Sequence, residues 1–412
     1  MTTIDHPICL SRPTFYRLCL RRRLAEAIMR RVLRRVPVRV TLPGGAVLGG
    51  GPDLPTIEIT APDAAFERLA HHPKIGMGEA YMAGEWRAAP GHDLADVMLP
   101  FAERMTTAVP PLLSRMRGVV ERAIPASQRG TLLGSRRNVE AHYDLSNELF
   151  ERFLDPSLMY SSALFDDARP WAEQSLEDGQ QRKVERVLDL AGVGAGTRVL
   201  EIGTGWGTLA IAAARRGARV TTLTLSHEQA ALARERVAAA GLADRVDVRL
   251  EDYREATGEY DAVVSVEMIE AVGEEYWPTY VETLDARLAH GGVVVLQAIL
   301  MDHERYLATR HSFGWIQKHI FPGGLIPSVR AVEEVAAAST TLRLVATDTF
   351  GRHYAETLRR WRTTFLQRWP EIARHGFDEE FRRMWEYYLA YCEAGFASGY
   401  LEVGHLTLRR VG

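Results

Sequence analysis

Short apolar segments alternate with helical segments from about residue 180 onward, and this alternation limits the fold more than any other feature of the sequence. Helical patterns separate the apolar runs, as in residues 227–241, which end on a glycine. Strands and helices that alternate in this way form a parallel sheet with helices on both faces. The expected strands are 197–203, 218–226, 245–252, 260–268 and 292–300.

The two ends of the chain follow other patterns. Residues 37–51 alternate and break at glycines like a hairpin, and residues 55–73 indicate a strand followed by a helix. The C-terminal third is helical and aromatic-rich, and it ends in an alternating segment typical of a strand. We therefore expect an α+β domain over residues 1–130. An α/β catalytic domain should follow over residues 131–412, with a mostly parallel, doubly wound sheet, an antiparallel last strand and helical lid segments.

Composition excludes several classes of protein. Fifty basic and 53 acidic side chains leave a net charge of −3, so the chain as a whole is not suited to nucleic acid. Cys9, Cys19 and Cys392 are too few and too scattered for a disulfide framework or a metal cluster. No apolar stretch reaches the roughly 18 residues of a spanning helix, and the N-terminus lacks a signal-peptide pattern. We expect a cytoplasmic protein without a metal site.

The N-terminal region is strongly basic. Ten arginines and one acid, Glu26, lie between Arg12 and Arg39, interleaved with aliphatic and aromatic residues. A helix with a basic and an apolar face suits an anionic membrane surface, which would place the protein at the inner face of the membrane. An ordinary surface helix that packs on the next domain fits the same pattern. Both interpretations stay open.

The most informative motif is VLEIGTGWG, in which a strand runs into Gly203, Gly205 and Gly207 before a helix begins. Glycines allow a tight turn and let a ligand approach the backbone, and the start of the helix supplies free N–H groups. A dinucleotide-binding turn would have its third glycine at position 208, which is Thr208. The observed spacing, led by Glu201, resembles the turn of class I methyltransferases that bind S-adenosylmethionine. Glu201 would orient the loop and the methionine end of the cofactor.

Further cofactor contacts are expected where the next two strands end. The second strand lacks the acid with which many methyltransferases hold the ribose, so Thr224 and Gln229 are the candidates there. Asp252 and Tyr253 follow the third strand and are candidates for covering the adenine. An ordinary loop is the alternative for this pair.

A series of motifs extends the resemblance over nearly the whole chain. In order they are KIGMGEAYMAGEW (74–86), AHYDLSNELF (141–150), YSSALF (160–165), EIGTGWG (201–207), LTLSHEQ (223–229), EDYRE (251–255), EMIEAVG (267–273), IFPGG (320–324), HYAETLRRW (353–361) and YYLAYCEAGF (387–396). Together they resemble the cyclopropane-fatty-acyl-phospholipid synthase family, which includes the mycolic acid cyclopropane synthases.

The resemblance implies transfer of a one-carbon unit from S-adenosylmethionine to the cis double bond of an unsaturated acyl chain in a phospholipid. An alkene is a poor nucleophile and must be held in line with the sulfonium methyl group in an apolar slot. Attack leaves a carbocation, and a base removes a proton. Loss from the new methyl group closes a cyclopropane ring, and a cyclopropane fatty acid is the product that we expect. Loss from a neighbouring carbon, which gives a methylene- or methyl-branched chain, is the alternative. A catalytically inactive lipid-binding homologue is a further alternative.

The resemblance also assigns roles to single residues. In this family the base is a bicarbonate ion held by a cysteine backbone, a glutamate, a histidine and a tyrosine. Glu270 matches the glutamate and Tyr354 the tyrosine, and Cys392 matches a cysteine near the reacting centre. Tyr160 and Ser161 match the pair that closes over the cofactor. A homodimer is also compatible with the resemblance.

The chain departs from the family at two positions of this set. Ser162 replaces the cysteine, and Gln297 replaces the histidine. Glutamine donates a hydrogen bond to an anion but cannot carry a positive charge or accept a proton. Bicarbonate as the base and ring closure as the outcome therefore stay open, as do acyl chain length, double-bond position, head group and oligomeric state.

Overall fold

The computed structural model describes residues 23, 25–104 and 147–411. The chain divides into two compact units, one with residues 1–118 and 379–387 and the other with residues 119–378 and 388–412. The expected domain boundary at residue 130 lies outside the described residues. Cys9, Cys19 and the arginines before Arg23 also lie outside them, whereas residues 25–33 form a helix.

The first unit is a small α+β fold built on a four-stranded sheet of order β2-β1-β3-β4. Its hairpin and the strand that precedes a helix confirm the pattern expected over residues 37–73. Apolar residues that alternate along the strands, such as Val38, Val40 and Ile57, are buried in its core. The elements are β1 (Arg39–Thr41), β2 (Val47–Gly49), β3 (Thr56–Ile59), α2 (Pro62–His71), α3 (Pro73–Met82), β4 (Trp86–Ala88) and α4 (Leu94–Glu103).

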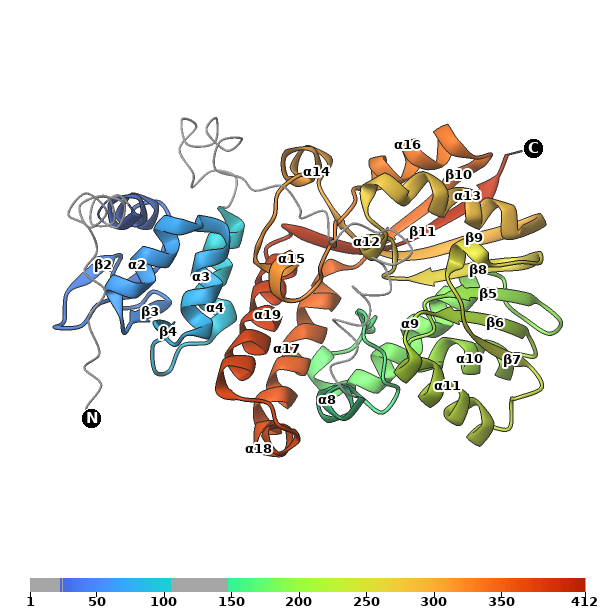
Figure 1. The fold of residues 1–412 in the computed structure, drawn as a ribbon, viewed down its shortest axis with the longest axis horizontal. Helices are drawn as coiled ribbons and strands as arrows, with labels where there is room; N and C mark the ends of the chain where they lie inside the picture. The colour runs from blue at the N-terminus through green and yellow to red at the C-terminus, as the bar shows by residue number, and fades with distance from the viewer. Residues whose placement is uncertain (1–22, 24, 105–146, 412) are drawn as a thin grey trace, which may run out of the picture. The chain divides into compact units, whose positions relative to one another are not determined.

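The second unit contains a seven-stranded sheet of order β10-β11-β9-β8-β5-β6-β7 (Figure 1). The neighbours from β7 to β9 pair in parallel, whereas β11 pairs antiparallel with both β9 and β10. The predicted α/β class, mostly parallel sheet and antiparallel last strand are confirmed. The strands are β5 (Arg198–Ile202), β6 (Arg219–Thr224), β7 (Val246–Leu250), β8 (Tyr260–Val266), β9 (Leu288–Met301), β10 (Leu342–Thr349) and β11 (Leu401–Arg410).

Helices cover both faces of this sheet (Figure 1). Apolar residues on both faces of the strands require this cover. In strand β5, Val199 packs with the helices of one face, whereas Leu200 and Ile202 pack with those of the other. One layer comprises α9 (Leu176–Leu190), α10 (Thr208–Arg215) and α11 (His227–Ala239). The other comprises α12 (Ile269–Val272), α13 (Trp277–Arg287) and α16 (Val329–Ser339).

The remaining helices carry most of the aromatic residues of the C-terminal third. Phe153 of α8 packs edge to face on Trp361 and Phe365 of α17. The elements are α8 (Asn147–Phe153), α14 (His303–Thr309), α15 (Trp315–His319), α17 (Gly351–Gln367), α18 (Trp369–Ile372) and α19 (Glu379–Ala397). Among the described residues, no helix has both the length and the apolar character needed to cross a membrane.

The strand order reverses between β5 and β8, which lie side by side in the middle of the sheet. Their parallel pairing brings Ile202 opposite Ser265, so the loops that leave both strands emerge together at the carboxyl edge. Open α/β sheets bind their ligands at such a reversal. The fold therefore places the glycine turn after β5 beside the segment after β8, which contains Glu267 and Glu270.

Candidate active site

The glycine turn after β5 has the shape of a cofactor cradle. Gly203, Gly205 and Gly207 have φ angles of 100°, 50° and 85°, a region that other residues rarely adopt. A Cβ atom on Gly203 would lie 2.8 Å from Cγ of Met268, so the loops after β5 and β8 are in close contact. A Cβ atom on Gly205 would meet no heavy atom within 4 Å. Open backbone at Gly205 leaves room for a ligand against the loop.

Glu201 lies on β5 just before this turn and is only 3 % exposed. Burial raises the pKa of its carboxyl group to about 8, against a hydrogen bond from Thr222 that lowers it. Its Oε2 atom is buried and has no hydrogen-bond partner in the described part of the chain. A buried carboxylate oxygen without a donor suits a cationic group such as an ammonium. The glycine turn and Glu201 thus fit the methionine end of S-adenosylmethionine.

The four cofactor candidates after the second and third strands form side-chain contacts with residues close to them in the sequence. Thr224 donates a hydrogen bond to Oε1 of Gln229 at 2.9 Å, which links the end of β6 to the start of α11. Both carboxylate oxygens of Asp252 accept from Arg254, and the Arg254 guanidinium also lies over the Tyr253 ring. The structure thus keeps all four residues at the carboxyl edge, where their role toward a ligand remains a prediction.

Tyr160 and Ser161 lie directly before Ser162, whose backbone N–H donates a hydrogen bond to Glu267. The Tyr160 hydroxyl lies 2.8 Å from that of Tyr388, and its ring packs against Phe150 and Trp361. The Ser161 hydroxyl accepts a hydrogen bond from Nζ of Lys183 at 2.6 Å. The aromatic surroundings of Tyr160 provide an apolar wall, and Ser161 connects this segment to α9.

Glu267 is the best-connected acid of the site, and the sequence analysis did not select it. Its Oε1 accepts hydrogen bonds from the backbone N–H of Ser162 at 2.9 Å and from Nε2 of Gln297 at 2.8 Å. Its Oε2 accepts one from the Tyr354 hydroxyl at 2.7 Å. Burial raises the pKa of this carboxyl group, while these donors lower it. The residue follows β8 directly and has a φ of 51°, in the left-handed region.

Strand pairing fixes how Gln297 faces Glu267. Gln297 on β9 lies opposite His405 on β11, and the two side chains meet with Nε2 of His405 3.0 Å from Oε1 of Gln297. Burial lowers the pKa of His405 to about 3, so its ring is neutral and donates from Nε2 to the amide oxygen. The amide NH₂ group of Gln297 therefore points to Glu267.

Glu270 lies in α12, three residues beyond Glu267. Its Oε1 accepts a hydrogen bond from the backbone N–H of Ile299, and its Oε2 is buried without a partner in the described part of the chain. Burial raises the pKa of Glu270 to about 8, and the neighbouring Glu267 carboxylate adds to the increase. The predicted carboxylate is thus buried at the sheet edge, but Gln297 and Tyr354 both donate to Glu267.

Lys183 is a second residue that the sequence analysis passed over. It lies on α9, is fully buried, and burial lowers its pKa to about 8. Glu267, Asp155 and Glu201 attract its charge and oppose that decrease. A buried ammonium among acids reduces the repulsion between them. No simple pattern marked this lysine, because it follows a glutamine and an arginine in a helix that is otherwise amphipathic.

Cys392 lies on α19 and is a free thiol. Burial raises its pKa to about 12, so it stays protonated near neutral pH. Only a thiolate is a strong nucleophile. A direct chemical role of Cys392 as a thiolate is therefore not supported by its surroundings, although it interacts electrostatically with Tyr354.

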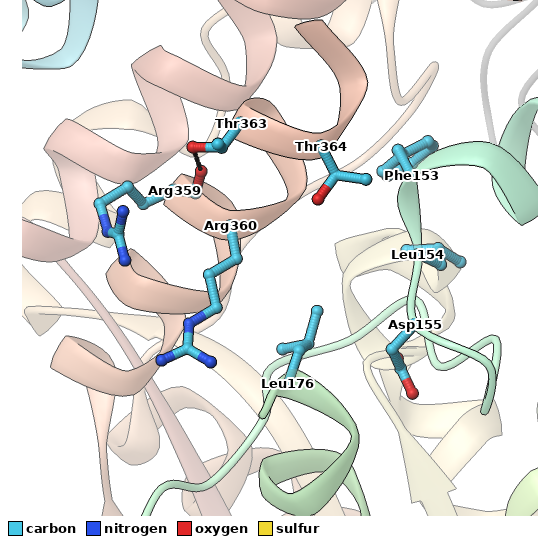
Figure 2. A pocket seen from close by; sticks show the side chains of 8 residues that line it. All are labelled: Phe153, Leu154, Asp155, Leu176, Arg359, Arg360, Thr363 and Thr364. Carbon is cyan, nitrogen blue, oxygen red and sulfur yellow. Dashed lines mark hydrogen bonds between the residues drawn. The ribbon is translucent and has the colours of Figure 1, made fainter. Parts of the chain in front are cut away.

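An open surface hollow lies apart from these groups (Figure 2). Phe153, Leu154, Leu176 and Asp155 line it together with polar side chains of α17. Arg359 and Arg360 reach it, but both also form ion pairs with Glu356. The hollow contains neither the glycine turn nor the acids after β8, so it is not part of the candidate active site. Within the described residues, no cluster of potential metal ligands is found.

Comparison with known proteins gives a consistent result. A family model described as mycolic acid cyclopropane synthetase matches residues 132–406. A tuberculostearic acid methyltransferase of Mycobacterium tuberculosis is 48 % identical and covers 94 % of this chain and 91 % of that protein. A cyclopropane-fatty-acyl-phospholipid synthase of Escherichia coli is 33 % identical and covers 89 % of this chain and 90 % of that protein.

Solved structures agree with these sequence matches. A cyclopropane synthase from Mycobacterium tuberculosis has a TM-score of 0.61 at 29 % identity, covering 66 % of this chain and 97 % of its own. A mycolic acid cyclopropane synthase in complex with SAH and CTAB has a TM-score of 0.60 at 28 % identity, covering 67 % of this chain and 98 % of its own.

Proposed function

Because this chain belongs to the mycolic acid cyclopropane synthetase family, we propose that it transfers the methyl carbon of S-adenosylmethionine to the cis double bond of an unsaturated fatty acyl chain, held in a phospholipid. The chain is an S-adenosylmethionine-dependent enzyme that modifies fatty acids. This assignment removes the alternative of an inactive lipid-binding homologue. The acyl substrate and the product are the parts that we propose.

The residues around the glycine turn support the cofactor's place. The turn and Glu201 would hold its methionine end, while the segment after β8 would face its sulfonium centre. S-adenosylmethionine supplies an electrophilic methyl group when it is bound. Glu201 then provides a negative charge for the ammonium group, and the aromatic groups around Tyr160 keep water from the reacting carbons.

One observation carries the proposal: two half-buried acids, Glu267 and Glu270, lie at the sheet reversal directly beside the cofactor turn. Methylation of an alkene produces a carbocation, which needs negative charge close by and a group that accepts a proton. A methyltransferase that acts on an oxygen or nitrogen atom has no need to stabilise a carbocation. The acids therefore favour an alkene as the acceptor.

For the product we propose a methylene-branched chain. Methyl addition gives a secondary cation, and a 1,2-hydride shift turns it into a more stable tertiary cation. Loss of a proton from the new methyl group then leaves a C=CH₂ group as a branch on the acyl chain. Gln297 stands in the place of the family's histidine and cannot accept a proton, which gives the hydride shift time to compete. The relative named as a methyltransferase, at 48 % identity, supports this choice.

A cyclopropane is the second candidate, and the 33 % identical synthase supports it. Ring closure needs loss of the methyl proton before any hydride shift. Both products have the same mass and the same balance of electrons. A saturated methyl branch would need a reductant and is therefore not a product of this single step.

The experiment uses S-adenosylmethionine with a labelled methyl group and dioleoyl phospholipid vesicles with deuterium on the two vinylic carbons. Label should enter the fatty acids with a mass gain of one CH₂ unit. In a methylene-branched product one deuterium moves to the neighbouring carbon, whereas a cyclopropane keeps both on their original carbons. Absence of label from every lipid would refute the proposed function.

We also propose that the basic N-terminal region contacts an anionic membrane surface. In its described part, Arg30, Arg31, Arg34 and Arg35 are exposed at the end of the helix. Exposed arginines gain binding energy from anionic lipids, and salt screens it. Flotation with vesicles should show binding to anionic lipid that is lost in neutral vesicles and in 1 M salt. Equal binding to both vesicles would contradict the electrostatic proposal.

A further inference from the structure

We propose that Glu267 is the general base of the reaction, so that its carboxylate takes the proton lost by the acyl carbocation and no bicarbonate ion is needed. The inference rests on the proposed function, because a base in this place is needed only if a carbocation forms. It goes beyond the proposed function because it identifies the group that accepts the proton.

Within the described residues, the hydrogen bonds of Glu267 leave one of its acceptor positions without a donor. A carboxylate has about four acceptor positions. Oε1 accepts from the Ser162 N–H and the Gln297 amide, and Oε2 accepts from the Tyr354 hydroxyl. These three donors come from different parts of the chain and fix the carboxylate in one orientation. The described part of the chain places no donor on the remaining lone pair of Oε2, which can take up a proton.

The groups on Glu267 are those that the family resemblance assigns to a bicarbonate ion. Ser162 stands for the cysteine whose backbone holds the ion, Gln297 stands for the histidine, and Tyr354 is the matching tyrosine. In this chain all three donate to a carboxylate of the protein itself. The side chain of Glu267 thus takes the position that an exogenous anion would need.

The backbone of Glu267 indicates that this arrangement is enforced by its surroundings. Its φ of 51° lies in the left-handed region, which is unfavourable for a residue with a side chain. A hydrogen bond of 2.7 Å from its N–H to the Gln297 carbonyl holds the turn. Glycine would adopt the same φ without strain. Glu267, in a position where glycine would be unstrained, brings a carboxylate into the site.

The step balances without any further reactant. The π electrons of the double bond form the new C–C bond to the methyl carbon, and the electrons of the broken C–S bond stay on sulfur. One C–H bond of the methyl group then breaks, and its electron pair forms the C=C bond or the ring bond. The proton goes to Oε2 of Glu267 and leaves to solvent before the next turnover.

Two substitutions at this position separate a base from a structural residue. Glu267→Gln keeps the size of the side chain but cannot take up the proton. Glu267→Gly suits the backbone, so the fold should persist, and it leaves space for a small carboxylate. Glu334→Gln, on the exposed surface of α16, is the matched control for loss of one carboxylate. Turnover is measured in bicarbonate-free buffer, with and without formate or bicarbonate, and S-adenosylmethionine binding is measured by calorimetry.

We expect wild-type turnover to be independent of bicarbonate and Glu267→Gln to lose at least about 100-fold in kcat while still binding the cofactor. Formate or bicarbonate should restore much of the turnover of Glu267→Gly but not that of Glu267→Gln. The inference is overturned if wild-type turnover requires bicarbonate, if Glu267→Gln stays within threefold of wild type, or if neither anion restores Glu267→Gly. A wild-type enzyme that labels no lipid would instead refute the proposed function.

Discussion

Replacing Glu201 with glutamine should stabilise the ligand-free protein and weaken its binding of the cofactor. Burial raises the pKa of Glu201 to about 8, so the folded protein at pH 7 keeps most of this group protonated. Glutamine resembles the protonated acid in size and polarity but does not titrate. Burial outweighs the attraction of Lys183, so without a bound cofactor the wild-type carboxyl group is a source of instability that Glu201→Gln removes.

The magnitude follows from the two pKa values. An unfolded chain loses this proton near pH 4.5 and the folded chain near pH 8, so folding takes up a proton between these values. Wild-type stability then falls as pH rises, by about 1.36 kcal/mol per pH unit. From about pH 5 to about pH 7.5, the advantage of Glu201→Gln over wild type should grow by about 3 kcal/mol.

Denaturant unfolding of both proteins at these two pH values measures the change, with Glu334→Gln as a control whose difference from wild type should stay nearly constant. Saturating S-adenosylmethionine should reverse the order, because the loss of a charged partner for the ammonium group weakens binding roughly tenfold or more. A stability difference between Glu201→Gln and wild type that does not change with pH would refute the reasoning.

Three further outcomes are expected. Glu270→Gln should lower turnover by about 100-fold or more and leave cofactor affinity within about threefold, as measured by calorimetry; full activity would contradict its role. Gln297→His should shift the product ratio in gas chromatography toward the ring, because an imidazole adds a second proton acceptor beside Glu267, and an unchanged ratio would remove this rationale. Cys392 should be alkylated at pH 8 far more slowly than a free cysteine in site-resolved mass spectrometry, since burial raises its pKa to about 12.

Local patterns were sufficient to predict the strands that position the site. Strands β5, β8 and β9 have apolar runs buried on both faces, whereas the edge strand β7 alternates between buried and exposed residues. The final alternating segment is β11. Strand β10 (Leu342–Thr349) was not predicted, because it lies at the sheet edge and most of its residues are exposed. An edge strand with so little buried surface has no strong hydrophobic pattern.

The candidate site was predicted in part. The glycine turn, Glu201 and Glu270 lie at the carboxyl edge as expected, because strand order determines where loops emerge. Glu267 could not be ranked above Glu270 from the sequence, since both stand in the same short motif. What distinguishes them is a left-handed backbone at Glu267 and donors from residues more than 85 positions away, which only the folded chain brings together.

Glu267 and Glu270 repel each other when both are ionised, so the charge of one carboxyl group raises the pKa of the other. Burial raises the pKa of both carboxyl groups, and the three donors on Glu267 oppose that rise. Burial raises the pKa of Glu270 to about 8, and the Glu267 carboxylate adds to the increase. At neutral pH the Glu270 carboxyl group of the ligand-free enzyme is therefore mostly protonated. A sulfonium cation nearby would lower the pKa of Glu270, but ionising it at pH 7 costs about 1.4 kcal/mol, which offsets much of the attraction. Glutamine resembles this protonated acid, so Glu270→Gln should leave cofactor affinity nearly unchanged. Turnover should fall because glutamine cannot ionise beside the carbocation.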